Sequence, residues 1–150
     1  MTKATLFLLS LVGFALAAAE PLGAQNAHVR TTEDLAIRRI AGEDEANVAR
    51  YLGPAAKCER QGTRLKCLYK LGSVEVVFRD GKADWVTIFP AGLPFSHTAL
   101  ARYGLPKDRK PSEANARQVR WTNIDWFYAV LAVAAGDGGV DYVRAQVRTP

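Results

Sequence analysis

Two nearly identical hexapeptides, ARYLGP at positions 49–54 and ARYGLP at positions 101–106, divide the chain into two similar parts. Val48 lies just before the first hexapeptide and Leu52 lies within it. The two residues are four positions apart, which is the spacing of the apolar stripe on a short helix. The glycine and proline that follow are typical of a helix end, because glycine adopts a left-handed backbone and proline prevents continuation. We therefore expect a helix over residues 44–52.

The second hexapeptide predicts a second helix that ends in the same way. Ser96 is positioned to cap it, and Phe95 is positioned to pack on Leu100. Gly104 stops the helix, and Leu105 follows where an apolar residue folds back onto Leu100 in a Schellman ending.

Three candidate strands follow each helix, which gives the order helix and three strands twice. The pattern predicts an α+β fold made of two tandem α-β-β-β units, residues 43–91 and 95–148, that form one antiparallel sheet with helices on one face. The expected strands are residues 65–70, 73–78, 83–89, 119–124, 126–134 and 140–147.

Residues 126–134 are the ambiguous element, because a continuous apolar run fits a buried strand or a buried helix equally well. The aromatic and valine residues favour a strand, whereas the alanines favour a helix. We expect a strand.

The register of one hairpin follows from its apolar residues. Hydrophobic matching places Val86 opposite Val74 or Val76, which requires an odd number of residues in the loop between the two strands. Residues 79–81, with Gly81 in a left-handed position, suit a three-residue connection.

The first 19 residues have the pattern of a secretory signal peptide: Lys3, an apolar run and small residues before the end. Cleavage after Ala19 fits best and cleavage after Ala24 is the alternative, as is an uncleaved membrane anchor. We expect residues 20–42 to be a tail and lead-in to a single domain over residues 43–148. Export predicts a periplasmic or secreted protein, and no later run is long enough to span a membrane.

Cys58 and Cys67 are the only cysteines. In an oxidising compartment two cysteines in a small domain predict a disulfide, and no nearby histidine or further cysteine completes a zinc site. Pairing them across a hairpin leaves a tight turn over residues 61–64.

The order of a helix, the pattern V-x-x-Y-L-G-P and three strands, in tandem in an exported protein, resembles two families. They are the β-lactamase inhibitor proteins and the small outer-membrane lipoproteins of the barrel-assembly machinery. Residues 44–48 and 51–54 carry the resemblance. Both families bind other proteins and are not enzymes, so the resemblance implies protein binding here. The lipoprotein's anchoring cysteine has no counterpart, and no inhibitor contact residue matches a position in this chain.

The charge of the chain does not indicate nucleic-acid binding. The formal net charge is +5, and the basic residues are spread through the sequence rather than gathered in a stripe. The densest cluster lies in the polar loop of residues 107–117, which we expect either to contact a partner or only to connect strands.

No catalytic motif is recognisable, so we expect neither an enzyme nor a bound cofactor or metal. His28 and His97 are expected at the surface, and the candidate acids Asp84, Asp125 and Asp141 show no pairing. The alternatives are a small extracytoplasmic enzyme or small-ligand carrier, with a pocket that gathers His97 and an aspartate, and a purely structural envelope protein.

A binding surface is expected on the sheet face opposite the helices. The candidate residues are aromatic, since aromatic side chains are enriched at protein interfaces, although core packing is the common role of such residues. Trp85 is the best of them, because it alternates with the core pair Val86 and Ile88. The candidates are Trp85, Tyr69, Trp121 and Tyr128. We therefore expect an exported, non-enzymatic module that binds another protein.

Overall fold

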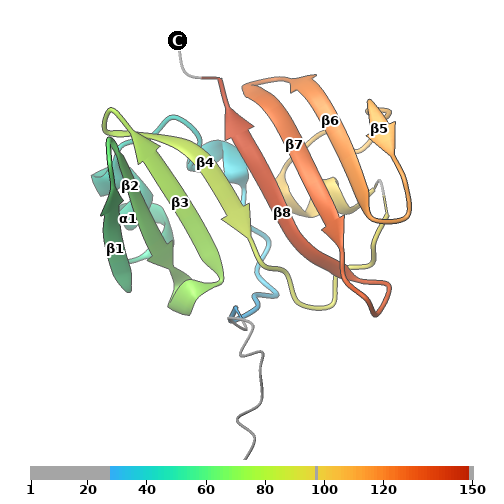
Figure 1. Cartoon of the computed structure of the whole chain (residues 1–150), viewed down its shortest axis with the longest axis horizontal. Helices are drawn as coiled ribbons and strands as arrows, with labels where there is room; N and C mark the ends of the chain where they lie inside the picture. The colour runs from blue at the N-terminus through green and yellow to red at the C-terminus, as the bar shows by residue number, and fades with distance from the viewer. Residues whose placement is uncertain (1–27, 97, 149–150) are drawn as a thin grey trace, which may run out of the picture.

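A computed structural model describes residues 28–96 and 98–148, and its main feature is one antiparallel sheet of eight strands (Figure 1). The strand order is β1-β2-β3-β4-β8-β7-β6-β5. The strands are β1 (Lys57–Gln61), β2 (Arg64–Tyr69), β3 (Val74–Arg79), β4 (Lys82–Ile88), β5 (Glu113–Ala114), β6 (Gln118–Ile124), β7 (Phe127–Ala134) and β8 (Val140–Val147). The predicted signal peptide, His97 and both candidate cleavage sites lie outside the described residues.

The prediction of two tandem helix-plus-three-strand units is wrong. The described residues contain one α-helix, α1 (Glu45–Leu52), and three short 3-10 segments, η1 (Ile37–Arg39), η2 (Lys70–Gly72) and η3 (Ala99–Tyr103). Each half of the sheet also has a fourth strand, β1 or β5, beyond the three expected; β1 is the first strand of the hairpin that the cysteine pairing predicted. The fold is therefore dominated by its sheet.

The second expected helix is only the five-residue segment η3. The hydroxyls of Ser96 and Thr98 hydrogen-bond to each other at 2.9 Å, so Ser96 does not cap a helix. Without a cap, this short segment forms the tighter helix that is common in short pieces. Its ending is as predicted: Gly104 is left-handed and the Leu105 amide donates to the Leu100 carbonyl at 3.2 Å.

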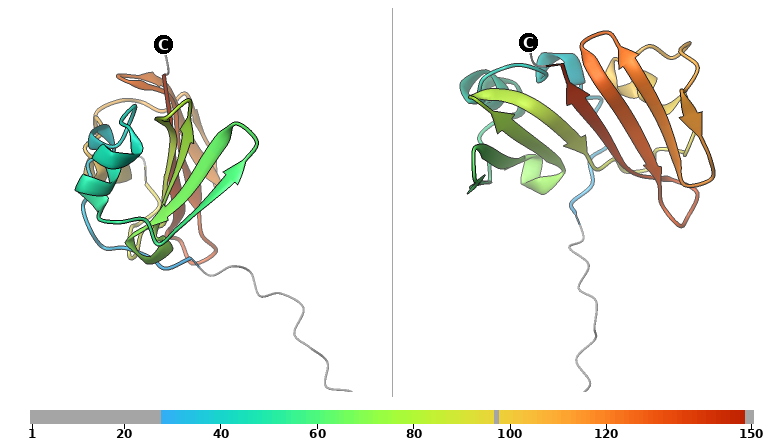
Figure 2. Two further views of the ribbon diagram at one scale, coloured as in Figure 1. Left: turned by 90° about the vertical axis from the view of Figure 1, so that its left-hand side faces the viewer. Right: turned by 45° about the horizontal axis from the view of Figure 1, so that its top comes forward.

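The two halves of the sheet join where β4 pairs with β8, with Val86 opposite Ala145. The α-helix and the 3-10 segments η1 and η3 lie on one side of the sheet, and the strands lie in front of them in Figure 1. Figure 2 shows the same layering from the side. We call the uncovered side the outer face. No helix within the described ranges is long and apolar enough to cross a membrane.

The individual strands agree with the sequence analysis more closely than the architecture does. Each of the six expected strands overlaps an observed one, and the ambiguous run is the strand β7. In the β3–β4 hairpin, Val86 lies opposite Val76, one of its two predicted partners. The connection itself differs, because it has two residues, Asp80 and Gly81, with φ angles of 51° and 77°. A β-bulge shifts the register by one residue, so that Val86 pairs with Val76, and it leaves Asp84 without a partner in β3.

The core lies between the sheet and the short helices. The sheet contributes the alternate side chains of its inner face, such as Val76, Val86 and Trp121. The expected lead-in also contributes, since Leu35 and Ile37 are buried in the same cluster. Burial of each such side chain contributes about 1.5–3 kcal/mol, so this segment adds to the stability of the domain.

The predicted disulfide between Cys58 and Cys67 is confirmed. The two residues lie directly opposite each other in β1 and β2, and their sulfur atoms are 2.01 Å apart. The bond therefore ties the edge strand β1 to its neighbour.

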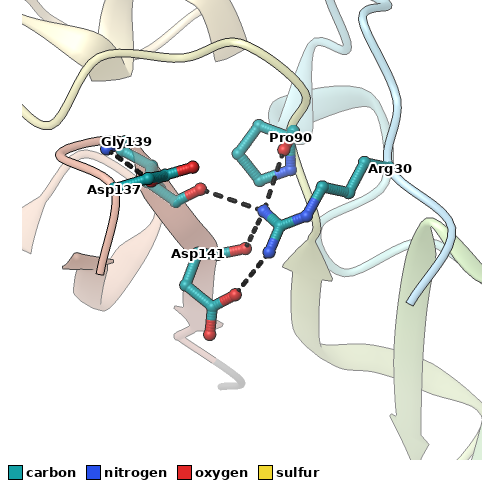
Figure 3. A network of polar contacts seen from close by, with 6 residues as sticks. Arg30, Pro90, Asp137, Gly139 and Asp141 are labelled. Atoms are coloured by element: carbon teal, nitrogen blue, oxygen red, sulfur yellow. Dashed lines mark hydrogen bonds and ion pairs between the residues drawn. The ribbon is translucent and has the colours of Figure 1, made fainter. Parts of the chain in front are cut away.

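An arginine near the start of the described chain holds the two halves together (Figure 3). One Arg30 amino group donates to the carbonyl oxygens of Pro90, Val140 and Asp141 at 3.2, 3.2 and 3.1 Å. The other contacts the Asp141 carboxylate at 2.7 Å. Arg30 therefore links the segment that follows β4 to the beginning of β8.

Candidate functional site

Two rows of side chains cross the outer face of the sheet. Because residues alternate between faces along each strand, the pairing register places every second residue on the outer face. One row is Leu68, Glu75, Thr87, Arg144, Leu131 and Arg120. The other is Lys66, Val77, Trp85, Gln146, Ala129 and Thr122. The face thus mixes apolar and basic side chains.

Trp85 lies at the centre of this face, where β4 meets β8. It is half-buried, and its indole Nε1 is a buried donor without a hydrogen-bond partner among the described residues. Because this nitrogen is buried, the exposed part of the ring is the part of Trp85 that a partner can contact.

Arg144 packs beside Trp85 and is held in place by its neighbours. Its guanidinium carbon lies 5.8 Å from the Trp85 ring centroid and 5.1 Å from that of Tyr142. Its Nε donates to the Thr87 hydroxyl at 3.0 Å. The cation–π contacts and this hydrogen bond orient the guanidinium across the face.

A small cavity of about 200 Å³ lies among these side chains. Its one acidic residue, Glu75, already contacts the Lys66 ammonium at 2.7 Å. The cavity is therefore rich in hydrogen-bond donors and carries an excess of positive charge. Its lining residues are Arg64, Glu75, Val77, Trp85, Thr87 and Arg144.

The four aromatic candidates separate into two groups. Trp85 lies on the outer face, and Tyr128 is 55% exposed near the β6–β7 turn, close to the exposed Trp126. Tyr69 and Trp121 are buried in the core, because alternation places them on the inner face with Cys67 and Val130. They therefore contribute nothing to an exposed surface.

The two buried aromatics have structural roles. The Trp121 indole donates to the Arg109 carbonyl at 3.0 Å, which holds the polar loop against β6. The Tyr69 hydroxyl has no hydrogen-bond partner among the described residues, and burial raises the pKa of this phenol to about 12, with a smaller contribution from the Glu45 charge.

Within the described ranges, the three candidate aspartates and His28 are each engaged in another contact. Each aspartate contacts an arginine: Asp84 contacts Arg79, Asp125 contacts Arg38 and Asp141 contacts Arg30. The His28 ring stacks on Phe89 with centroids 3.7 Å apart. Glu45 lies near both cysteine sulfurs, but the disulfide leaves no thiolate there for a metal.

Sequence reasoning missed Arg144 and Thr87. They are 57 residues apart, and only the pairing of β4 with β8 brings them together. Within β8, the alternation of Arg144 with the apolar Val143 and Ala145 shows that it faces outward, but it does not show which residue it meets.

Comparisons with known proteins give little information. No protein-family model matches the chain, and no curated protein matches it either. Among solved structures, it is similar to an extracellular protein containing a SCP domain from Bacillus anthracis str. Ames, with a TM-score of 0.43 and 10% identity. The match covers 84% of this chain and 50% of the other, so the chain spans half that protein's length. A similarity at this level is evidence for neither a family nor a function.

The disulfide indicates the kind of compartment in which the protein resides. Disulfides form and persist in oxidising environments and are rare in the cytoplasm. The Cys58–Cys67 bond therefore fits an extracytoplasmic protein.

Proposed function

We propose that this chain is an exported, non-enzymatic module that binds another protein through the outer face of its sheet. The observation that carries the proposal is Trp85, a half-buried aromatic residue at the centre of the uncovered face, where it packs beside Arg144. Export, to the periplasm or beyond the cell, is supported by the signal-like first 19 residues and by the disulfide.

The chemistry of this face suits a protein partner. Tryptophan, tyrosine and arginine dominate the binding energy of many interfaces, and Trp85, Tyr142 and Arg144 stand together here. Half-buried Val77 and Leu131 add apolar area near them. Because these side chains project from paired strands, little conformational entropy is lost when a partner binds.

The proposal is tested by capture with the immobilised mature protein from the extracellular or envelope fraction of the producing cells. We expect Trp85→Ala to lose the captured protein. Trp126→Ala is the matched control, because Trp126 is 70% exposed on the β6–β7 turn and belongs to neither row of the outer face. Near-ultraviolet circular dichroism checks that both variants fold. Equal capture by the two variants would remove the outer face from the binding site.

A further inference from the structure

The cavity beside Trp85 also indicates what kind of partner the outer face binds. We propose that this cavity binds a carboxylate of an acidic segment on the partner protein; this inference rests on the function proposed above. The observations that carry it are the position of Arg144 beside Trp85 and the balance of charge around the cavity.

Arg144 differs from the other half-buried arginines. Three arginines in the described part of the chain are half-buried: Arg79, Arg102 and Arg144. Arg79 contacts the Asp84 carboxylate at 3.0 Å, and Arg102 contacts that of Asp34 at 2.7 Å. Arg144 has no acidic partner among the described residues and donates only to the neutral Thr87 hydroxyl. Because a partly desolvated charge is unfavourable without a counter-charge, an external anion would stabilise this site.

The polar groups of the cavity match a carboxylate. The guanidinium groups of Arg64 and Arg144, which line the cavity, are donors only, and an ionised carboxylate is an acceptor only. The Arg144 Nε is already bonded to Thr87, which leaves its two amino groups for a bidentate contact. Arg64 lines the same cavity from β2 and adds a second cation.

The size of the cavity favours a side chain over a whole small molecule. Its volume of about 200 Å³ is below the roughly 300–1,000 Å³ of pockets that hold drug-sized ligands. A glutamate or aspartate side chain fits such a space while the rest of the segment lies on the open face. Arg120, exposed in the same row as Arg144, extends the positive charge toward β6.

The test uses a hexaglutamate peptide as the probe and the indole N–H resonances of ¹⁵N-labelled mature protein as the readout. We expect a saturable shift of the Trp85 resonance, identified by its loss in Trp85→Phe, while those of Trp121 and Trp126 stay in place. Hexaglutamine should bind at least about tenfold more weakly, because charge-assisted bonds are the stronger ones.

Two variants assign the binding to the cavity. Arg144→Gln should weaken hexaglutamate binding by about tenfold, as expected when one partner of a charged pair is removed. Arg50→Gln is the control, because Arg50 is exposed on α1 and lies away from the outer face. If Arg144→Gln does not fold, the exposed Arg64→Gln tests the same cavity.

Three results would overturn the inference: no shift at Trp85, an equal loss in Arg50→Gln, or tighter binding of a ten-nucleotide oligothymidylate than of hexaglutamate. The last would assign the cavity to phosphate.

The outcomes also separate the two proposals. If Trp85→Ala abolishes capture but hexaglutamate does not bind, protein binding stands and the acidic partner is wrong. If capture is unaffected, the proposed function fails.

Discussion

Tyr103 provides a sharp test of the packing in the core. Its side chain is completely buried and its hydroxyl has no hydrogen-bond partner in the described structure. An unsatisfied buried polar group costs about 1–3 kcal/mol. We therefore expect Tyr103→Phe, which removes only the hydroxyl, to raise the free energy of unfolding by about 1 kcal/mol at pH 7. For a domain of this size, that corresponds to an increase in Tm of about 4 °C.

The same residue predicts a loss of stability at alkaline pH. Burial raises the pKa of the Tyr103 phenol to about 12, while nearby Arg102 lowers it and Asp34 raises it by smaller amounts. An unfolded tyrosine has a pKa of about 10, so above this pH the unfolded state loses its proton first. Ionisation of this phenol therefore leaves the free energy of unfolding unchanged below pH 10 and lowers it as the pH rises from 10 toward 12. Tyr103→Phe should lose less stability over that interval.

Urea unfolding at pH 7 and at several values between pH 10 and 12 measures both effects. Tyr51→Phe is the matched control, because the Tyr51 hydroxyl accepts a hydrogen bond from the Ala36 amide at 3.0 Å. That variant should lose about 1 kcal/mol at pH 7. If Tyr103→Phe is destabilised like Tyr51→Phe and keeps the alkaline profile of the parent protein, the hydroxyl has a partner and the reasoning is refuted.

Three further changes test other parts of the fold by urea unfolding. Replacing Cys58 and Cys67 together with serine should cost about 2.7 kcal/mol, the chain-entropy value for a ten-residue ring, and no loss would mean that the bond does not form. Arg30→Ala should cost about 1–2 kcal/mol, and Arg30→Lys less, because lysine keeps the contact with Asp141; equal losses would contradict the role of the guanidinium. Leu71→Gly should raise stability by about 1 kcal/mol, because Leu71 is 81% exposed with a φ angle of 57°, and a loss would show that its side chain makes a contact.

Local features of the fold could be predicted from the sequence because they depend on neighbouring residues. Alternation in residues 73–78 and 83–89 identified two strands and predicted Val74 or Val76 opposite Val86, and Val76 is the observed partner. The bulge at Asp84 could not be predicted in this way, because a three-residue turn and a two-residue turn with a bulge both place Val86 opposite an apolar residue of the same face, Val74 in the first case and Val76 in the second. The length of the second helix was overestimated, because a sequence match at residues 101–106 does not show how many residues before it are helical.

Only part of the candidate site could be predicted from the sequence. Trp85 was assigned to the outer face because it alternates with buried neighbours, and its side chain lies there. The same alternation applied to β2 would have placed Tyr69 on the inner face with Cys67. Arg144 and the cavity depend on how β4 pairs with β8, which is a long-range choice that local patterns do not determine.

Hydroxyl-radical footprinting of the mature protein, alone and in the cell fraction from which its partner is captured, tests the central claim directly. The account predicts that binding protects Trp85, Tyr142 and Leu131 from oxidation, since these residues lie on or beside the uncovered sheet face. Oxidation of Trp126 and Tyr128 should not change. Protection confined to Trp126 and Tyr128, with Trp85 unchanged, would contradict the claim and place the interface at the β6–β7 turn.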